Sequence, residues 1–310
     1  MKYFFTKYKF FLSGAALILT AASCTSTLSD EPATDARAIS FTPAAETRAA
    51  VDGTTLPNDF LVWGGYSNTL LFEGETVHPD GSYENGTRYW VPGTYNFYAV
   101  YPATIKDKDK TTFSNGTLTV KNFDCSATGN AAVDLMTAAS GVMEYKEGNN
   151  PPESVNLNFQ HELARVNIIV TSEGDAVKIS NAKIYGINHI GTLSNNQWTM
   201  SEVSTETNPS FRGSLEIPSA DTKPYGLFGG DLLLIPASTE KLTNAILSFD
   251  YQYVNGTSKS AKIELKRDRI QEWVAGSQYK YTVTIPKNAV DITVNVEILK
   301  WNEKNYTVTW

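Results

Sequence analysis

The chain has 310 residues, of which 12% are aromatic and 19% charged, and its formal net charge is −7. Residues 1–23 hold three of the 26 Lys and Arg residues and none of the 33 Asp and Glu residues, so the rest of the chain has a net charge near −10. An acidic surface repels phosphate backbones, which argues against nucleic-acid binding, and the length is enough for two domains.

The first 23 residues have the pattern of a secretory signal. Three lysines precede an apolar run at residues 10–22, which ends in small residues. This run of about 13 residues is short of the roughly 20 that span a bilayer, so we favour a signal over a transmembrane anchor. A Cys directly after Ala21-Ala22-Ser23 is typical of bacterial lipoprotein processing, although Ala21 stands where Leu is usual. We therefore expect cleavage after residue 23 and a lipid on Cys24 as the only membrane anchor.

The segment after Cys24 predicts a tether followed by one strand. Residues 24–37 are rich in Ser, Thr, Asp and Pro and too poor in apolar residues to pack. Residues 38–43 then alternate, which places Ile39 and Phe41 on one face of a short strand. Arg48 follows in a small, polar stretch that is typical of an exposed loop.

The rest of the chain alternates between polar and apolar residues in short runs, separated by turn residues such as Pro79-Asp80-Gly81 and Asn255-Gly256. Asn255-Gly256 predicts a hairpin. The main expected strands are 60–66, 95–101, 117–123, 155–170, 178–187, 197–200, 214–217, 231–236, 245–254, 259–266, 279–285 and 291–299. Such a pattern predicts an all-β chain of two antiparallel sandwiches, at 38–172 and 173–310, with a break at 149–152 as the alternative boundary.

We find no catalytic or metal-binding motif in the sequence. The stretch His161-Glu162-Leu163-Ala164-Arg165 begins like a zinc-protease helix, but Arg stands where the second His ligand would be. Cys125 has no disulfide partner if Cys24 carries the lipid, and it is expected to be a small buried or half-buried residue. We therefore expect no enzyme activity, no metal and no cofactor.

Two further features leave alternatives open. The six Trp and sixteen Tyr residues are expected mainly in the core, but a sugar-stacking platform of Trp63, Tyr66, Tyr89 and Trp90 is the alternative. Near the end of the chain, one expected strand face is followed by a second short alternating run. The first consists of Ile292, Val294, Val296 and Ile298, and the second of Tyr306, Val308 and Trp310. Both runs either close the second sandwich or donate a strand to another molecule.

Several segments together resemble the fimbrillin family, the subunits of type V pili of anaerobic Gram-negative bacteria. They are FLVWGGY at 60–66, RYWVPGTYNFYAVYP at 88–102, VDLMTA at 133–138, VNLNFQHELARVNIIV at 155–170, LLLIP at 232–236, WVAGSQYKY at 273–281 and Trp301. The resemblance implies two transthyretin-like β-sandwiches. It also implies a lipoprotein precursor that is exported to the outer membrane and the cell surface and ends in a fimbrium.

The resemblance further implies how such a subunit assembles. An arginine-specific protease cuts the loop after the first strand, and a strand from a neighbouring pilus subunit fills the groove that opens. This places the cut after Arg48, with Arg37 as the competitor, makes Ile39 and Phe41 part of the displaced strand, and makes residues 291–310 the donor candidate. The sequence does not distinguish stalk, tip and anchor subunits, and it names no receptor. The alternative function is a monomeric glycan-binding lipoprotein of the outer membrane.

Overall fold

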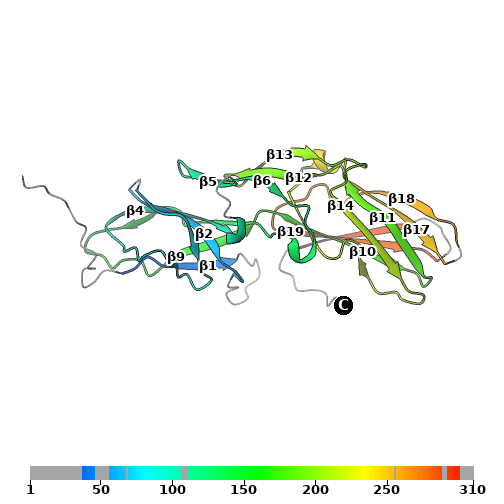
Figure 1. Cartoon of the computed structure of the whole chain (residues 1–310), viewed down its shortest axis with the longest axis horizontal. Helices are drawn as coiled ribbons and strands as arrows, with labels where there is room; N and C mark the ends of the chain where they lie inside the picture. Colours follow the sequence, from blue (N-terminus) through cyan, green and yellow to red (C-terminus); the bar gives the residue numbers. More distant parts are fainter. Residues whose placement is uncertain are drawn as a thin grey trace, which may run out of the picture. The chain divides into compact units, whose positions relative to one another are not determined.

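The computed structural model describes residues 37–45, 56–67, 69–105, 110–254, 256–287 and 292–300. These residues belong to one compact unit, Ala36–Trp310. They form twenty strands, one short helix, α1 (Thr239–Leu242), and two 3₁₀ turns, η1 (Ala103–Ile105) and η2 (Gly129–Ala131). The all-β prediction is confirmed (Figure 1).

The described strands form four sheets. The seven-stranded sheet contains, in spatial order, β1 (Phe41–Ala45), β9 (Val155–His161), β7 (Met136–Ala139), β4 (Gly93–Tyr101), β2 (Phe60–Tyr66) and β3 (Thr69–Val77), and β8 (Met143–Tyr145) pairs with β4. A four-stranded sheet contains β13 (Gln197–Val203), β12 (Asn188–Ser194), β6 (Thr117–Asp124) and β5 (Thr111–Ser114).

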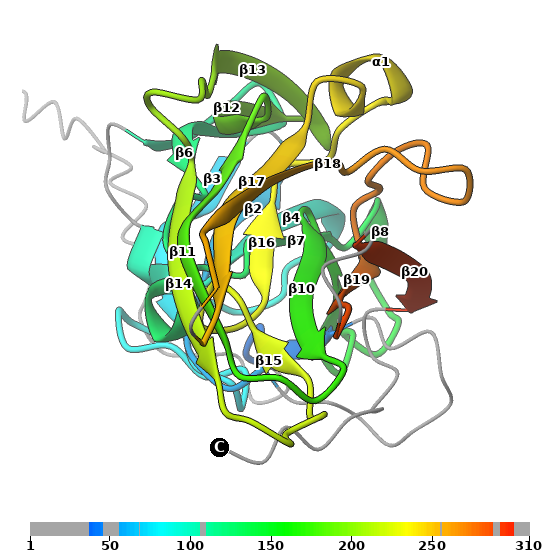
Figure 2. The ribbon, with the colours of Figure 1, turned by 90° about the vertical axis from the view of Figure 1, so that its right-hand side faces the viewer.

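The two other sheets come from the second half of the chain. The five-stranded sheet contains β15 (Tyr225–Gly226), β10 (Ala164–Ser172), β19 (Ser277–Ile285) and β20 (Thr293–Lys300), and β16 (Leu232–Leu234) pairs with β10. It faces a sheet of β14 (Phe211–Ile217), β11 (Val177–Tyr185), β17 (Ile246–Tyr253) and β18 (Lys259–Glu264), as Figure 2 shows.

Two apolar clusters hold these sheets together. The larger cluster lies between the two sheets of the second half and includes Ile168, Ile179 and Tyr281. It continues without a break to Trp63 and Leu61 on one face of the seven-stranded sheet. The smaller cluster lies on the opposite face of that sheet and includes β1. The predicted domain boundaries near 172 and at 149–152 stay predictions. The chain passes from the seven-stranded to the five-stranded sheet between β9 and β10.

Two strand pairs depart from the antiparallel prediction. β1 runs parallel to β9, and β10 runs parallel to β19. A hairpin forces its two strands to be antiparallel, but more than a hundred residues separate the members of each of these pairs, so no short turn fixes their direction. The predicted hairpin around Asn255 is confirmed as the antiparallel pair β17–β18, although Asn255 itself lies outside the described residues.

Candidate functional site

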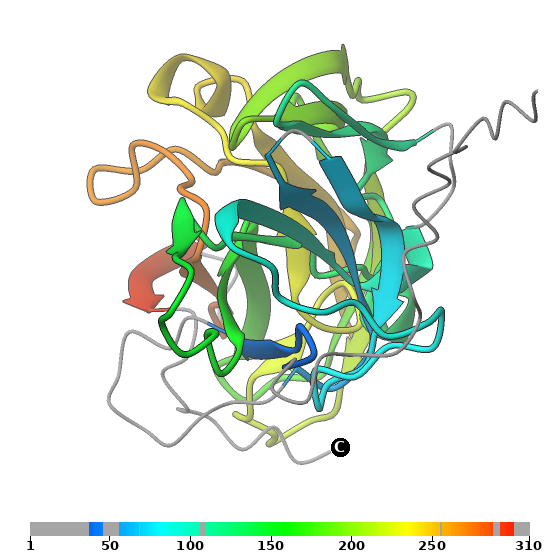
Figure 3. The ribbon, with the colours of Figure 1, turned by 90° about the vertical axis from the view of Figure 1, so that its left-hand side faces the viewer.

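β1 lies at one edge of the seven-stranded sheet and pairs there with β9 (Figure 3). The N–H of Val155 donates to the carbonyl of Ser40 at 2.8 Å, and the Ser40 hydroxyl donates to the carbonyl of Glu153 at 3.2 Å. The hydroxyls of Thr42 and Ser154 are 2.7 Å apart. One side of the strand is therefore bonded to β9 and to the residues just before it.

The segment of residues 81–90, here called the clasp, bonds the other side of the same strand. The N–H of Ile39 donates to the carbonyl of Arg88 at 2.7 Å, and the N–H of Phe41 donates to the carbonyl of Gly81 at 3.3 Å. The carbonyl of Arg37 accepts the N–H of Trp90 at 3.0 Å. Residues 37–41 are thus hydrogen-bonded on both sides, to β9 and the residues before it and to the clasp. A strand at the edge of a sheet normally has a partner on one side only.

Alternate side chains of the strand fill an apolar groove. Ile39 is 1% exposed and Phe41 is 2% exposed. The Phe41 ring packs edge-on against Phe72, with ring centroids 5.1 Å apart, and against Phe97 at 5.6 Å. Full burial of a side chain of this size stabilises a fold by about 1.5–3 kcal/mol, so the strand is held by its side chains as much as by its backbone. The shared face predicted for Ile39 and Phe41 is confirmed.

A buried ion pair keeps the clasp in position. Arg88 Nη2 lies 3.0 Å from Glu75 Oε2, and the Glu75 side chain is only 7% exposed. Asn85 Nδ2 donates to the other carboxylate oxygen of Glu75 at 2.6 Å. The Arg88 guanidinium also lies over the ring of Phe72, 4.5 Å from its centroid. The residue that bonds the backbone of Ile39 is thereby fixed through its own side chain.

Tyr83 connects the clasp directly to the strand. Its hydroxyl donates to the carbonyl of Ile39 at 2.9 Å and accepts the N–H of Arg88 at 3.2 Å. Burial raises the pKa of Tyr83, so the phenol stays protonated and able to donate at neutral pH. Sequence reasoning missed the clasp; the Pro79-Asp80-Gly81 signal indicated a turn but not its contact with a strand forty residues earlier.

The predicted processing and lipidation residues fall partly outside the described part of the chain. Cys24, Arg48, Tyr306, Val308 and Trp310 lie there, so their predicted roles stay predictions. Arg37, the competing cleavage position, is described. It is exposed, and its Nη1 donates to the carbonyl of Pro151 at 3.3 Å.

The first donor candidate lies in a sheet of its own molecule. β20 pairs antiparallel with β19. Ile292, Val294 and Val296 are partly buried against the larger apolar cluster, whereas Ile298 is 53% exposed. The contacts of β20 agree with one of the two alternatives for this segment, namely that it closes the second sandwich within its own molecule. A donor role for this run stays a prediction.

The core positions expected for the aromatics are confirmed for two tryptophans of the alternative sugar-stacking platform. Trp63 is 6% exposed and Trp90 is 4% exposed, and they belong to different apolar clusters on opposite faces of the seven-stranded sheet. The two tyrosines are half-buried, and Tyr66 stacks on Tyr95 with ring centroids 5.4 Å apart. These aromatics pack the interior rather than forming one exposed surface.

The remaining sequence candidates also have structural roles. Cys125 is 5% exposed, and burial raises the pKa of its thiol to about 12, so it carries little thiolate at neutral pH. His161–Arg165 joins β9 to β10 instead of forming a helix, and His161 Nδ1 lies 3.0 Å from Asp134 Oδ1. Within the described ranges no group of three His, Cys, Asp or Glu residues could hold a metal. None of the helices described has the length and apolar character to cross a membrane.

The sequence from residue 42 to residue 301 matches the family described as Fimbrillin-like. Comparison with proteins of curated function gives no match. Among solved structures, a protein described as a cell adhesion protein from Bacteroides uniformis is 20% identical, with a TM-score of 0.52, over 86% of this chain and 100% of that one.

Two further solved structures are similar. One, described as a cell adhesion protein from Bacteroides ovatus, has 14% identity and a TM-score of 0.55 over 87% of this chain and 99% of that one. The other, a fimbrial protein from Bacteroides vulgatus, has 18% identity and a TM-score of 0.54 over 86% and 100%. At these identities the similarity shows a shared fold.

Proposed function

The chain belongs to the fimbrillin-like family, and from that premise we propose that it is a structural subunit of a bacterial surface pilus that assembles by proteolysis-triggered strand exchange. The observation that carries the proposal is the strand at residues 37–45, which pairs with β9 and is bonded at residues 37–41, on its other side, to the clasp. Arg48 follows this strand by three residues in the sequence. A cut after Arg48 breaks the covalent link between the strand and the residues that line its groove, which all lie after Arg48 in the sequence.

Loss of the strand leaves two kinds of unsatisfied surface. The carbonyls of Arg88 and Gly81 and the N–H of Val155 lose their partners, and Phe72 and Phe97 lose the cover of Phe41. Unpaired backbone groups beside an apolar groove favour the addition of another strand. Five reburied apolar side chains contribute on the order of 5–10 kcal/mol before ordering costs, at roughly 25 cal/mol per Å².

The donor is expected to come from residues 291–310 of a neighbouring subunit. Within this range we favour Tyr306, Val308 and Trp310, because β20 already pairs with β19 and packs Val294 on its own core. Use of Ile292, Val294, Val296 and Ile298 as the donor requires β20 to leave β19 first. A subunit that accepts a strand without donating one has the same groove.

The route to the surface is proposed from the sequence. A signal at residues 1–23 and a lipid on Cys24 bring the precursor to the outer membrane, with residues 24–37 as a tether. An arginine-specific protease then acts after Arg48, with Arg37 as its competitor. The partners are other pilus subunits, and the expected role is adhesive and structural rather than enzymatic.

Limited digestion tests the proposal. An unlipidated chain that starts at Thr25, without the signal and Cys24, is treated with an arginine-specific protease and followed by N-terminal sequencing and native mass spectrometry. We expect a new terminus at Ala49, release of residues 25–48 and the appearance of oligomers. Arg48→Ala is expected to stay intact and monomeric, whereas Arg37→Ala behaves like the parent chain.

Two synthetic peptides test separately whether the groove opens and which segment fills it. A peptide of residues 37–45 is expected to rebind the cleaved chain and block oligomers, and a peptide of residues 302–310 is expected to compete with it. A cleaved chain that stays monomeric and binds neither peptide contradicts strand exchange. A chain that rebinds 37–45 but not 302–310 keeps the groove and overturns the proposed donor.

A further inference from the structure

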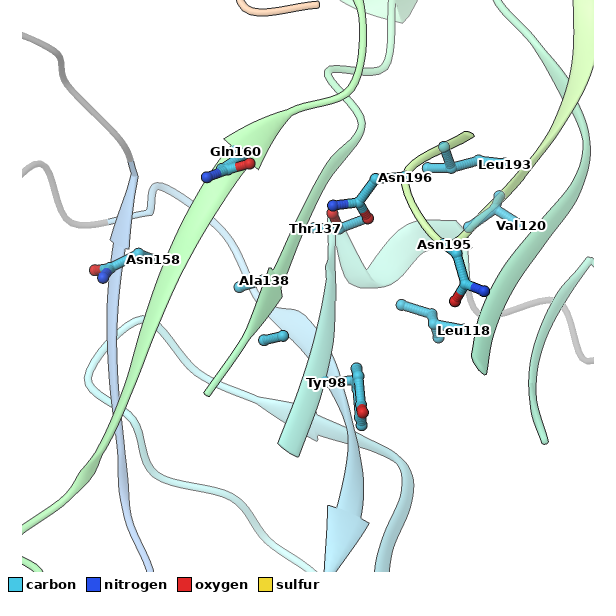
Figure 4. A pocket seen from close by; sticks show the side chains of 11 residues that line it. Tyr98, Leu118, Val120, Thr137, Ala138, Asn158, Gln160, Leu193, Asn195 and Asn196 are labelled. Atoms are coloured by element: carbon cyan, nitrogen blue, oxygen red, sulfur yellow. The ribbon is translucent and has the colours of Figure 1, made fainter. Parts of the chain in front are cut away.

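A cavity of about 530 Å³ lies on the face of β9 opposite the side chains that fill the groove of β1 (Figure 4). Tyr98 of β4, Thr137 of β7, and Asn158 and Gln160 of β9 line one side of it. β6 and the turn between β12 and β13 line the other side, as Figure 4 shows. Its volume is within the roughly 300–1,000 Å³ of small-molecule sites.

Side-chain amides dominate the polar part of this lining. Asn158 and Gln160 project from the solvent-facing side of β9, and Asn195 and Asn196 form the β12–β13 turn. All four are exposed, and within the described residues none of these four side chains makes a hydrogen bond. Each amide offers two donor hydrogens and an acceptor oxygen to a ligand.

The backbone of the turn favours Asn and Gly, which tolerate positive φ. Asn195 has φ +48° and Asn196 has φ +57°, so both central residues adopt the left-handed conformation of a type I′ turn. Glycine is the preferred second residue of such a turn, so Asn196 can be replaced by Gly without strain in the turn. Asn at this position adds an amide to the cavity wall.

The apolar part of the lining is small and includes one aromatic ring. Tyr98 is half-buried, and its ring lies against Phe113, with centroids 5.2 Å apart. Leu118 and Leu193 add aliphatic surface on the other side. None of the described residues that line the cavity is charged.

We propose that this amide-lined cavity binds a neutral saccharide. A sugar ring has a C–H face that can pack on Tyr98 and a fringe of hydroxyls that both donate and accept, as the four amides do. An anionic ligand would lack an Arg or Lys partner, and a purely apolar ligand would leave the amides unpaired. A peptide residue offers one N–H donor and one C=O acceptor, whereas every hydroxyl around a sugar ring both donates and accepts.

The test uses the exported full chain and named probes. An array of neutral oligosaccharides built from glucose, galactose, mannose, fucose and N-acetylhexosamines is screened beside sialylated and sulfated ones, and hits are titrated by calorimetry. We expect binding to neutral glycans. We expect Asn158→Ala and Gln160→Ala each to weaken it roughly five- to tenfold, the equivalent of one lost hydrogen bond.

Asn196→Gly separates binding from folding. Glycine suits the type I′ turn, so the thermal midpoint is expected to stay or rise while glycan affinity falls. Asn156→Ala is the matched control, because Asn156 is on the same face of β9 but does not line the cavity.

Three results overturn the proposal: no neutral glycan binds, only charged glycans bind, or binding survives Asn158→Ala and Asn196→Gly unchanged. Failure here leaves strand exchange intact, since the side chains that fill the groove of β1 lie on the opposite face of β9, although Asn158 pairs with Ala44 through its backbone.

Discussion

The carbonyl oxygen of Phe41 lies where a Cβ atom on Gly81 would have to be. Gly81 has φ +85°, and its own carbonyl accepts the N–H of Phe41 at 3.3 Å. Glycine is required here twice, first for the left-handed backbone and second for the close passage of the strand. This contact couples the start of the clasp to the strand that is proposed to leave.

Gly81→Ala is therefore expected to loosen residues 37–45. Backbone strain and overlap with Phe41 together should lower stability by about 2 kcal/mol or more and speed cleavage at Arg48. Gly86→Ala is the control, because Gly86 has φ +74° in the same segment but no atom within 4 Å of its added Cβ. It should cost only about 1 kcal/mol. Equal effects of the two variants on the cleavage rate would contradict the coupling.

Phe41→Ala in the uncleaved chain should be strongly destabilising. The ring is 2% exposed and packs against Phe72 and Phe97, and truncation of such a residue costs about 3–5 kcal/mol. Urea unfolding measures the loss. Thr42→Ala on the exposed face of the same strand should cost about 1 kcal/mol at most, through its contact with Ser154.

The Arg88–Glu75 pair is expected to show strong coupling. Arg88→Met leaves a carboxylate that is 7% exposed without its cation, which should cost about 2–3 kcal/mol. Adding Glu75→Gln removes the orphaned charge and should recover part of that loss. A double-mutant cycle by equilibrium unfolding measures the coupling. Additive losses in the cycle would show that the pair does not hold the clasp.

Stability should fall with rising pH through Glu162. This residue is 5% exposed and accepts a hydrogen bond from the Thr137 hydroxyl, and burial raises its pKa. A carboxyl whose pKa is higher when folded contributes stability below its unfolded pKa. That contribution is lost as pH rises through the folded value.

Glu162→Gln should therefore flatten the pH dependence of unfolding above about pH 4.5 and raise stability at pH 7. Glu153→Gln, at an exposed position, is the control and should leave the slope unchanged. Equal slopes for the parent chain and Glu162→Gln would show that burial of this carboxyl is not the cause.

The sequence predicted strands better than their partners. Residues 60–66 form β2 as expected, because alternation and turn residues are local signals. Residues 155–170 were expected as one run but form β9 and β10, which belong to different sheets. Glu162 and Leu163 connect the two strands, and the alternation of polar and apolar residues is hardly interrupted there. The periodicity therefore does not reveal that the chain moves from one sheet to another.

From the sequence, the strand of the candidate site could be predicted but the clasp could not. Ile39 and Phe41 could be placed on one face from alternation, but the clasp depends on Arg88, Tyr83 and Gly81, far along the chain. The alternative platform put Trp63 and Trp90 together, yet they belong to different apolar clusters on opposite faces of a sheet. The sequence alone does not show which distant segments lie next to a strand in the fold.

Removal of residues 302–310 separates the two runs proposed as donors. β20 keeps its pairing with β19, and Val296 keeps its contact with the core, so the uncleaved variant should unfold within about 1 kcal/mol of the parent chain. After cleavage at Arg48 it should accept a strand but donate none. Mixed with cleaved parent chain, it should shorten the oligomers seen by native mass spectrometry in proportion to its share.

Val296→Asp is the contrasting variant, because it puts a charge on the partly buried face of β20 and should destabilise the uncleaved monomer itself. If the shortened chain instead forms oligomers as long as those of the parent, the donor lies outside residues 302–310. β20 would then be the remaining candidate within 291–310, and its release from β19 would be the step that limits assembly.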